Sequence, residues 1–133
     1  MTSGRTDELI EAARVARERS YAPYSDFKMG AAVATSSGNV VPGALMENVS
    51  LGLAMCAERV ALFSAMAAGQ EPTELALVSE RTDGKLTWPC GACLQVALEF
   101  AGADLVVHVA DTGGETATST VGELLPRGPK ITR

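Results

Sequence analysis

Hydrophobic residues recur along this chain with two periods, and the change from one to the other divides it into helices and strands. The first segment, from about Arg5 to Ser20, has charged residues between apolar ones at helical spacing, namely Leu9, Ile10, Ala13 and Ala16. Apolar residues then alternate from Phe27 to Val33, which is the period of a strand. Ser36-Ser37-Gly38-Asn39 is typical of a turn, so we expect a hairpin that continues through Val40 and Val41.

The rest of the chain alternates between helical and strand-like segments. Helix-forming residues run from Cys56 to Ala68, and Gly69 is suited to end that helix. The apolar run Leu75-Ala76-Leu77-Val78 predicts a strand, and Pro89 to Ala101 has helical spacing again. Two more strands are expected, an apolar one at Leu105–Ala110 and a threonine-rich one at Thr116–Val121.

This order of elements, α-β-β-α-β-α-β-β, predicts an α/β fold. We expect a mixed five-stranded sheet, antiparallel at the first hairpin and parallel where helices cross over, with helices covering its faces. The chain has 133 residues, of which 47% are hydrophobic, so we expect a single domain over residues 1–133.

Charge and hydropathy narrow the class of ligand. The formal net charge is -5, so the chain lacks the basic surface that neutralises phosphates, and 5% aromatic residues leave few rings for stacking several bases. No apolar stretch is long enough to cross a bilayer, and the first residues are too polar for a signal peptide. We expect a cytoplasmic protein that binds a small molecule, with no nucleic-acid or membrane partner.

The three cysteines lie in two short motifs, Cys56-Ala57-Glu58 and Pro89-Cys90-Gly91-Ala92-Cys93, each at the start of a predicted helix. An odd number of cysteines does not favour a disulfide framework. The positive end of a helix favours thiolate, the form of cysteine that binds zinc. Three protein ligands would leave a fourth position open for water, which is typical of a catalytic zinc site. The only histidine, His108, lies in an apolar run and is expected to be structural.

The residues after Cys56 suggest what such a site does. A zinc ligand, one residue and a glutamate, with Pro-Cys-x-x-Cys downstream, is the pattern of zinc nucleobase deaminases. Glu58 would take a proton from the attacking water and deliver it to the ring nitrogen and the leaving ammonia. Three thiolates give a divalent zinc site a net charge of about -1. We therefore expect Arg59 to offset that charge by a hydrogen bond to a thiolate.

Each motif also has a simpler interpretation. Free cysteines are often small buried hydrophobic residues, a Cys-x-x-Cys pair is common in redox proteins, and a glutamate on a first helical turn favours the helix dipole. The combination of both motifs in one short chain, each at a helix start, favours the catalytic zinc site.

At these residues the chain resembles the small homotetrameric cytidine deaminases, and the resemblance extends over nearly its whole length. It is carried by Tyr21-Ala22-Pro23-Tyr24-Ser25, Phe27, Gly30-Ala31-Ala32, Cys56-Ala57-Glu58-Arg59, Pro89-Cys90-Gly91-Ala92-Cys93, Gln95 and Leu124-Leu125-Pro126. It implies a three-layer αβα fold, hydrolysis of cytidine and deoxycytidine to the uridines, and a homotetramer with active sites shared between neighbours. It also implies one Zn2+ per subunit, held by Cys56, Cys90 and Cys93, and substrate contacts from Phe27, Glu47 and Ala57.

The sequence departs from that family at the sugar-binding motif. The pattern Gly-x-Asn-x-Glu-Asn is present as Gly43-Ala44-Leu45-Met46-Glu47-Asn48, so Leu45 replaces an asparagine. The arginine usual after the last zinc cysteine is Leu94, and Arg127-Gly128-Pro129 stands where a C-terminal aromatic residue is expected. A leucine cannot hydrogen-bond a sugar hydroxyl. We therefore expect Leu45 to make the substrate pocket more apolar and to favour a modified sugar or base, unless other contacts compensate.

Three other functions remain open on the sequence alone. One is deamination of another amino heterocycle, such as a blasticidin-type antibiotic, by the same zinc site. A second is a non-catalytic zinc module, which the presence of Glu58 disfavours. A third is an enzyme that edits polynucleotides, which the acidic charge disfavours.

Overall fold

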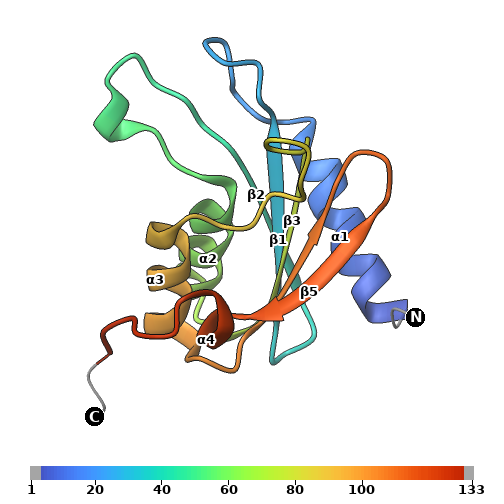
Figure 1. Ribbon diagram of the computed structural model, residues 1–133. Helices are drawn as coiled ribbons and strands as arrows, with labels where there is room; N and C mark the ends of the chain where they lie inside the picture. Colours follow the sequence, from blue (N-terminus) through green and yellow to red (C-terminus); the bar gives the residue numbers. More distant parts are fainter. Residues whose placement is uncertain (1–3, 131–133) are drawn as a thin grey trace.

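Five strands form one mixed sheet in the order β2-β1-β3-β4-β5. The computed structural model describes residues 4–130, and Figure 1 shows how the elements are arranged. In chain order they are α1 (Gly4–Arg17), β1 (Met29–Thr35), β2 (Val40–Ala44), the 3-10 helix η1 (Leu51–Leu53), α2 (Ala57–Ala67), β3 (Pro72–Ser79), α3 (Gly91–Ala101), β4 (Val106–Ala110), β5 (Thr116–Thr120) and α4 (Val121–Leu124).

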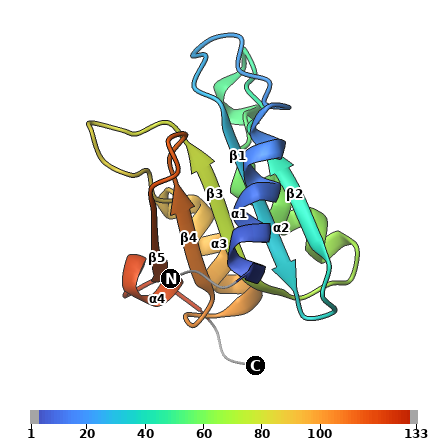
Figure 2. The ribbon, with the colours of Figure 1, turned by 90° about the vertical axis from the view of Figure 1, so that its right-hand side faces the viewer.

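Helices cover both faces of the sheet, which confirms the predicted three-layer αβα fold. Figure 2 shows α1 in front of the sheet with α2 and α3 behind it. Successive side chains of a strand point to opposite faces, and β1 contributes to a core on each side. Ala31 and Val33 pack in the core with α2 and α3, whereas Ala32 and Ala34 pack in the core with α1. Strand β1 therefore lies at the centre of the molecule.

The strand directions agree with the predicted mixed sheet, with one refinement. Strand β1 is antiparallel to β2, as the hairpin predicted, and is also antiparallel to β3. The crossover through α3 joins the parallel neighbours β3 and β4. The crossover through α2 joins β2 to β3, but these strands are not neighbours because β1 lies between them. The sequence pattern gave the direction of each crossover but not the order of the strands.

Several boundaries differ from the sequence prediction. Helix α1 ends at Arg17 rather than near Ser20, whose hydroxyl instead donates a hydrogen bond to the carbonyl of Met29 (2.8 Å). The last strand ends at Thr120, and Val121 begins α4, which was not predicted. The Thr120 hydroxyl accepts a hydrogen bond from the N–H of Glu123 and caps this short helix.

A close approach between helix and strand sets the position of α2. A side chain on Gly43 of β2 would overlap the backbone of Ala57 and Ala61, so only glycine allows α2 to pack this near the sheet. The start of α2, which follows Cys56, is held there as a result. None of the helices within residues 4–130 is long and apolar enough to span a bilayer.

His108 is buried on the α1 side of the sheet, away from the cysteines. Its ring nitrogens lie 2.9 Å from the Thr118 hydroxyl and 2.8 Å from a carboxylate oxygen of Glu74. Both ring nitrogens therefore have hydrogen-bond partners, which explains how a polar ring can be buried here. They agree with the structural role expected from the sequence.

Candidate metal and active site

The starts of α2 and α3 bring all three cysteines together. The Sγ atoms of Cys56, Cys90 and Cys93 all lie within 4.8 Å of one another, although the residues come from two separate segments. Cys56 and Cys90 are the N-cap residues of α2 and α3, both with extended backbone, and Cys93 follows on the first turn of α3. Two helix N-termini therefore direct their partial positive charge at the sulfur atoms, which favours thiolates.

Hydrogen bonds decide which of Cys56 and Cys93 ionises more readily. A hydrogen bond from Cys93, aided by the hydrogen bond and charge of Arg59, lowers the pKa of Cys56 to about 5 against the opposing effect of burial. The pKa of Cys93 is raised, chiefly because its proton is shared with Cys56 and because the side chain is buried. Of these two cysteines, Cys56 is therefore the one that more readily carries a negative charge. Three sulfur donors at this spacing suit a soft, thiolate-binding metal such as zinc.

Glu58 is almost completely buried beside this cysteine group. Its side chain is 1% exposed, and its Oε1 atom has no hydrogen-bond partner among the described residues. Burial raises the pKa of Glu58 to about 7, and the charge of Cys56 acts in the same direction. A buried, unpaired carboxylate oxygen is unfavourable unless a bound ligand or water forms a hydrogen bond with it. The three sulfurs and this oxygen fit a zinc ion with a position open to a ligand.

Arg59 contacts the cysteine group from the next position of α2. Its Nη2 atom lies 3.3 Å from Cys56 Sγ, and this hydrogen bond raises the pKa of the guanidinium. The Nε atom of Arg59 is buried without a hydrogen-bond partner among the described residues. A permanent positive charge is thus held against the Cys56 thiolate, where it can offset excess negative charge.

Glu47 has a contact that the sequence did not reveal. One of its carboxylate oxygens accepts hydrogen bonds from the N–H groups of Tyr24 (2.9 Å) and Ser25 (3.3 Å), and the other accepts one from the Ser25 hydroxyl. The Ser25 and Tyr24 bonds hold the pKa of Glu47 below its usual value. Since the Ser25 hydroxyl also accepts a bond from the N–H of Phe27 (3.0 Å), Glu47 helps to position Phe27. This contact could not be predicted from the local sequence, because more than twenty residues separate Glu47 from its partners.

The other two expected substrate-contact residues lie near the start of α2. Ala57 is completely buried in the core, so its backbone N–H at the helix start is the group that could meet a ligand. Leu45 directly follows β2 and is half-buried; its N–H donates to the carbonyl of Met29 (3.1 Å). By strand alternation its side chain is on the same side as Gly43, which faces α2.

Comparison with known proteins identifies a zinc-binding deaminase region in this chain. The family model for the cytidine and deoxycytidylate deaminase zinc-binding region matches residues 4–109 of this chain. The chain belongs to this deaminase family. Among curated relatives, the cytidine deaminase of Halalkalibacterium halodurans is 44% identical over 118 residues, which are 89% of each chain.

Solved structures of cytidine deaminases also match. The structure from Burkholderia pseudomallei is 46% identical, has a TM-score of 0.87, and is matched over 97% of this chain and 100% of that one. The structure from Mycobacterium tuberculosis is 34% identical, has a TM-score of 0.76, and is matched over 92% of this chain and 95% of that one. These similarities extend beyond the zinc-binding region to the complete deaminase fold.

Removing the Arg59 charge is expected to lower turnover without releasing zinc. In Arg59→Gln the three sulfurs remain, so zinc content should stay near one per chain, while kcat should fall by about tenfold because excess negative charge weakens activation of water. Zinc assay and steady-state kinetics on the same preparation test this. Arg59→Lys, which keeps the charge, should retain more activity; unchanged turnover in Arg59→Gln would remove Arg59 from this role.

Proposed function

We infer that this protein is a zinc-dependent enzyme that removes the amino group of cytidine and deoxycytidine by hydrolysis, releasing ammonia and the uridines. The observation that carries this function is the group of three sulfurs within 4.8 Å of one another, with the buried Glu58 carboxylate beside it. Relatives named cytidine deaminase, matched over most of both chains, support the choice of a cytosine nucleoside.

The proposed roles follow from the chemistry of the site. Zinc, held by Cys56, Cys90 and Cys93, supplies Lewis-acid activation of water at neutral pH when it is bound. Glu58 accepts the proton of that water and passes it to the ring nitrogen of the base, and later protonates the amino group that leaves as ammonia. A pKa of about 7 suits a group that must both accept and donate a proton near neutral pH. Arg59 keeps Cys56 as a thiolate throughout.

The direct test is ammonia release from a panel of aminated nucleosides and free bases, with zinc content measured on the same protein. We expect release from cytidine-type nucleosides and one zinc per chain. The panel should include a blasticidin-type aminopyrimidine nucleoside, since the same zinc site could act on it. A zinc-loaded protein that releases ammonia from no cytosine nucleoside would refute the proposed function.

Leu45 is proposed to shift the sugar preference of this enzyme. A hydroxyl left buried without a partner costs about 1 to 3 kcal/mol, and each 1.4 kcal/mol corresponds to about tenfold in affinity. We expect wild type to favour deoxygenated or modified sugars, or substituted bases, and Leu45→Asn to improve kcat/KM for cytidine by roughly tenfold. Competition assays with cytidine, deoxycytidine and modified analogues measure this.

The far end of α2 provides a matched control for Leu45. Met66 is 38% exposed and lies in the last turn of α2 (Ala57–Ala67), so Met66→Asn replaces an apolar side chain by the same amide away from the start of that helix. Its kinetic parameters should resemble those of wild type. If wild type already prefers cytidine and Leu45→Asn brings no gain, the assignment of Leu45 is wrong.

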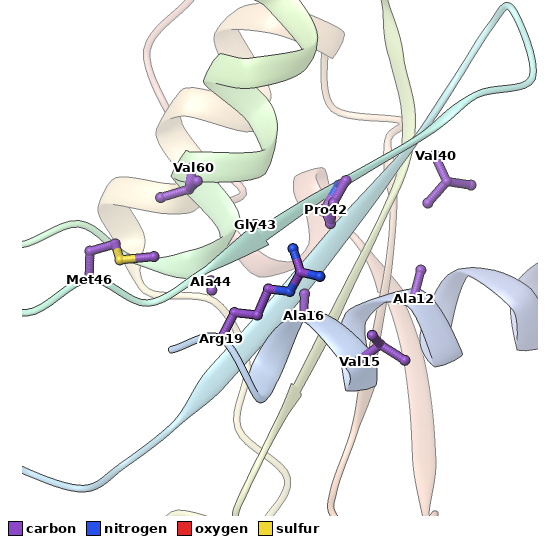
Figure 3. A pocket seen from close by; sticks show the side chains of 10 residues that line it. All are labelled: Ala12, Val15, Ala16, Arg19, Val40, Pro42, Gly43, Ala44, Met46 and Val60. Carbon is purple, nitrogen blue, oxygen red and sulfur yellow. The ribbon is translucent and has the colours of Figure 1, made fainter. Parts of the chain in front are cut away.

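A homotetramer is the proposed assembly, and exposed apolar surface supports it. The segment between β2 and α2 projects from the body of the molecule (Figure 1) and carries Val49, Leu51 and Leu53, which are 80%, 86% and 69% exposed. A groove of about 540 Å3 between α1, β2 and Val60 of α2 is also mainly apolar; Figure 3 shows the residues that line it, with Arg19 among them. Apolar patches of this kind mark interfaces. Light scattering of the zinc-loaded protein should give four chains per particle, and a stable monomer would refute the assembly.

A cytoplasmic location is part of the same proposal. The three cysteines are all free, and two of them are at least partly accessible to solvent. A reducing compartment keeps such thiols available for metal, whereas an oxidising one favours disulfides.

A further inference from the structure

A single arginine connects the loop before the zinc-binding cysteines of α3 to the turn between β4 and β5. All three nitrogens of the Arg81 guanidinium are used. Nε donates to Asp111 Oδ2 (2.9 Å), Nη2 donates to Glu115 Oε1 (2.8 Å), and Nη1 donates to the carbonyl of Gly84 (3.1 Å). These contacts join segments about thirty residues apart in sequence and lie outside the cysteine group.

The turn on which Arg81 is anchored is itself well held. The N–H of Asp111 donates to the carbonyl of Glu115 (3.0 Å), and the other carboxylate oxygen of Asp111 accepts the N–H of Glu115 (2.9 Å). Arg14 of α1 adds a longer contact to the carbonyl of Asp111 (3.4 Å). Burial acts to raise the pKa of Asp111, but the bonds from Glu115 and Arg81 outweigh it and keep the pKa below its usual value. The Asp111 carboxylate is thus a charged, partly buried anchor for Arg81.

The loop that follows Arg81 is closed by its own hydrogen bonds. Thr82 and Lys85 exchange two backbone bonds (2.9 and 3.0 Å), and the hydroxyls of Thr82 and Thr87 lie 2.7 Å apart. The Thr87 hydroxyl also donates to the carbonyl of Glu80 (3.0 Å). Residues 80–87 are therefore connected to one another by hydrogen bonds, and only Trp88 and Pro89 separate this loop from Cys90.

Cys90 is the most exposed of the three cysteines. Cys93 is fully buried within α3, and Cys56 accepts a hydrogen bond from Arg59. Cys90 is exposed and stands before the first residue of α3, so its position depends on the chain that leads into it. That chain is held by Arg81, by Leu86 and Trp88, which pack against the core, and by a longer, mostly exposed pair between Glu80 and Arg17 (3.6 Å). An exposed pair of this kind contributes little.

We propose that Arg81 is a positioning residue for the zinc site, acting through the closed loop 80–87 on Cys90. By fixing this loop to Asp111 and Glu115, it keeps the exposed thiol within bonding distance of the other two sulfurs. Arg81 contacts no reacting group, so its effect is on zinc retention and on the geometry of the site. The inference rests on the proposed zinc deaminase function.

The test compares full-length, zinc-loaded variants. Supporting contacts around metal ligands typically change metal affinity or activity by 10- to 100-fold, so Arg81→Gln should release zinc to a chelator roughly tenfold faster than wild type. The kcat should fall with little change in KM, because the substrate contacts are untouched. The zinc-release rate of Arg81→Lys should lie between those of wild type and Arg81→Gln, since the lysine ammonium can replace only some of the hydrogen bonds of the guanidinium.

Two controls separate positioning from general destabilisation. Arg5→Gln removes the same charge from an exposed position at the start of α1 and should behave as wild type. Ile10→Val loosens the core on the α1 side, on the opposite face of the sheet from α2 and α3. If Arg81→Gln releases zinc no faster than Ile10→Val at an equal loss of Tm, Arg81 is merely structural and the proposal is overturned.

A double variant tests the route of the effect. Asp111→Asn combined with Arg81→Gln should release zinc no faster than Arg81→Gln alone, because both act through one contact. Additive effects would overturn the proposed route. A wild-type protein that binds zinc but deaminates nothing would refute the deaminase function, while zinc release from the variants would still report on the positioning role.

Discussion

Replacing Glu58 by glutamine is expected to lower kcat by about 10²- to 10⁴-fold, the usual contribution of a positioned general acid and base. Glutamine keeps the size and shape of the side chain, which is 1% exposed and packed at the start of α2. It cannot accept a proton from water or return one to the leaving amine. The three cysteines are unchanged, so zinc content should stay at one per chain. Steady-state kinetics with cytidine and a zinc assay on the same sample measure both.

An exposed glutamate of the adjacent helix provides the control for Glu58. Glu99 lies on α3, is exposed, and belongs to neither cysteine motif, so Glu99→Gln should leave kcat unchanged. The pH profile adds a second readout. Burial raises the pKa of Glu58 to about 7. Because glutamine does not titrate, the pH dependence of kcat that Glu58 causes near pH 7 should be absent in the variant. A Glu58→Gln enzyme with near-normal kcat would show that another group moves the proton.

Local patterns were enough to predict the elements that carry the cysteines. The helices after Cys56 and Cys90 were predicted from helix-forming residues and apolar spacing, and in the structure both cysteines are N-caps. Because the chemistry is concentrated at two helix starts, knowing where each helix begins nearly gives the site. Only the packing of α2 beside α3 was needed to bring the sulfurs within 4.8 Å.

The order of the strands could not be predicted from the same patterns. Strand β1 is apolar at almost every position because it is buried on both faces, and a local period cannot show which strands flank it. Its place between β2 and β3 follows from the packing of α1 on one face and α2 on the other. The need for glycine at position 43 is explained only by the structure, in which α2 packs directly against this residue.

Polar contacts between residues far apart in the chain could not be predicted from the sequence either. Nothing in the local pattern pairs Arg81 with Asp111, or Glu47 with the N–H groups of Tyr24 and Ser25. Charged residues in loops are common, and their partners are decided by tertiary structure. The roles of Glu47 and Phe27 toward substrate accordingly stay predictions, while their connection through Ser25 is an observation of the structure.

Replacing Cys93 by serine is expected to remove zinc and to reduce deamination to the background rate. Cys93 is completely buried at the first turn of α3, so no solvent-exposed group can take its place. A serine hydroxyl is a much poorer zinc ligand than a thiolate at neutral pH. Cys56 and Cys90 alone would hold the metal through two sulfurs from different segments. Zinc content by atomic absorption and ammonia release should fall together.

Stability provides a measurement that does not depend on activity. A ligand that binds only the folded state stabilises it by RT ln(1 + [L]/Kd), about 4 kcal/mol at a thousandfold excess over Kd. Adding zinc to wild type should therefore raise the free energy of unfolding by about that amount. The same addition should leave Cys93→Ser nearly unchanged, and without zinc the two proteins should have similar stability. A Cys93→Ser protein that keeps one zinc per chain and its turnover would show that the three sulfurs do not form the metal site, and the deaminase mechanism built on them would fail with it.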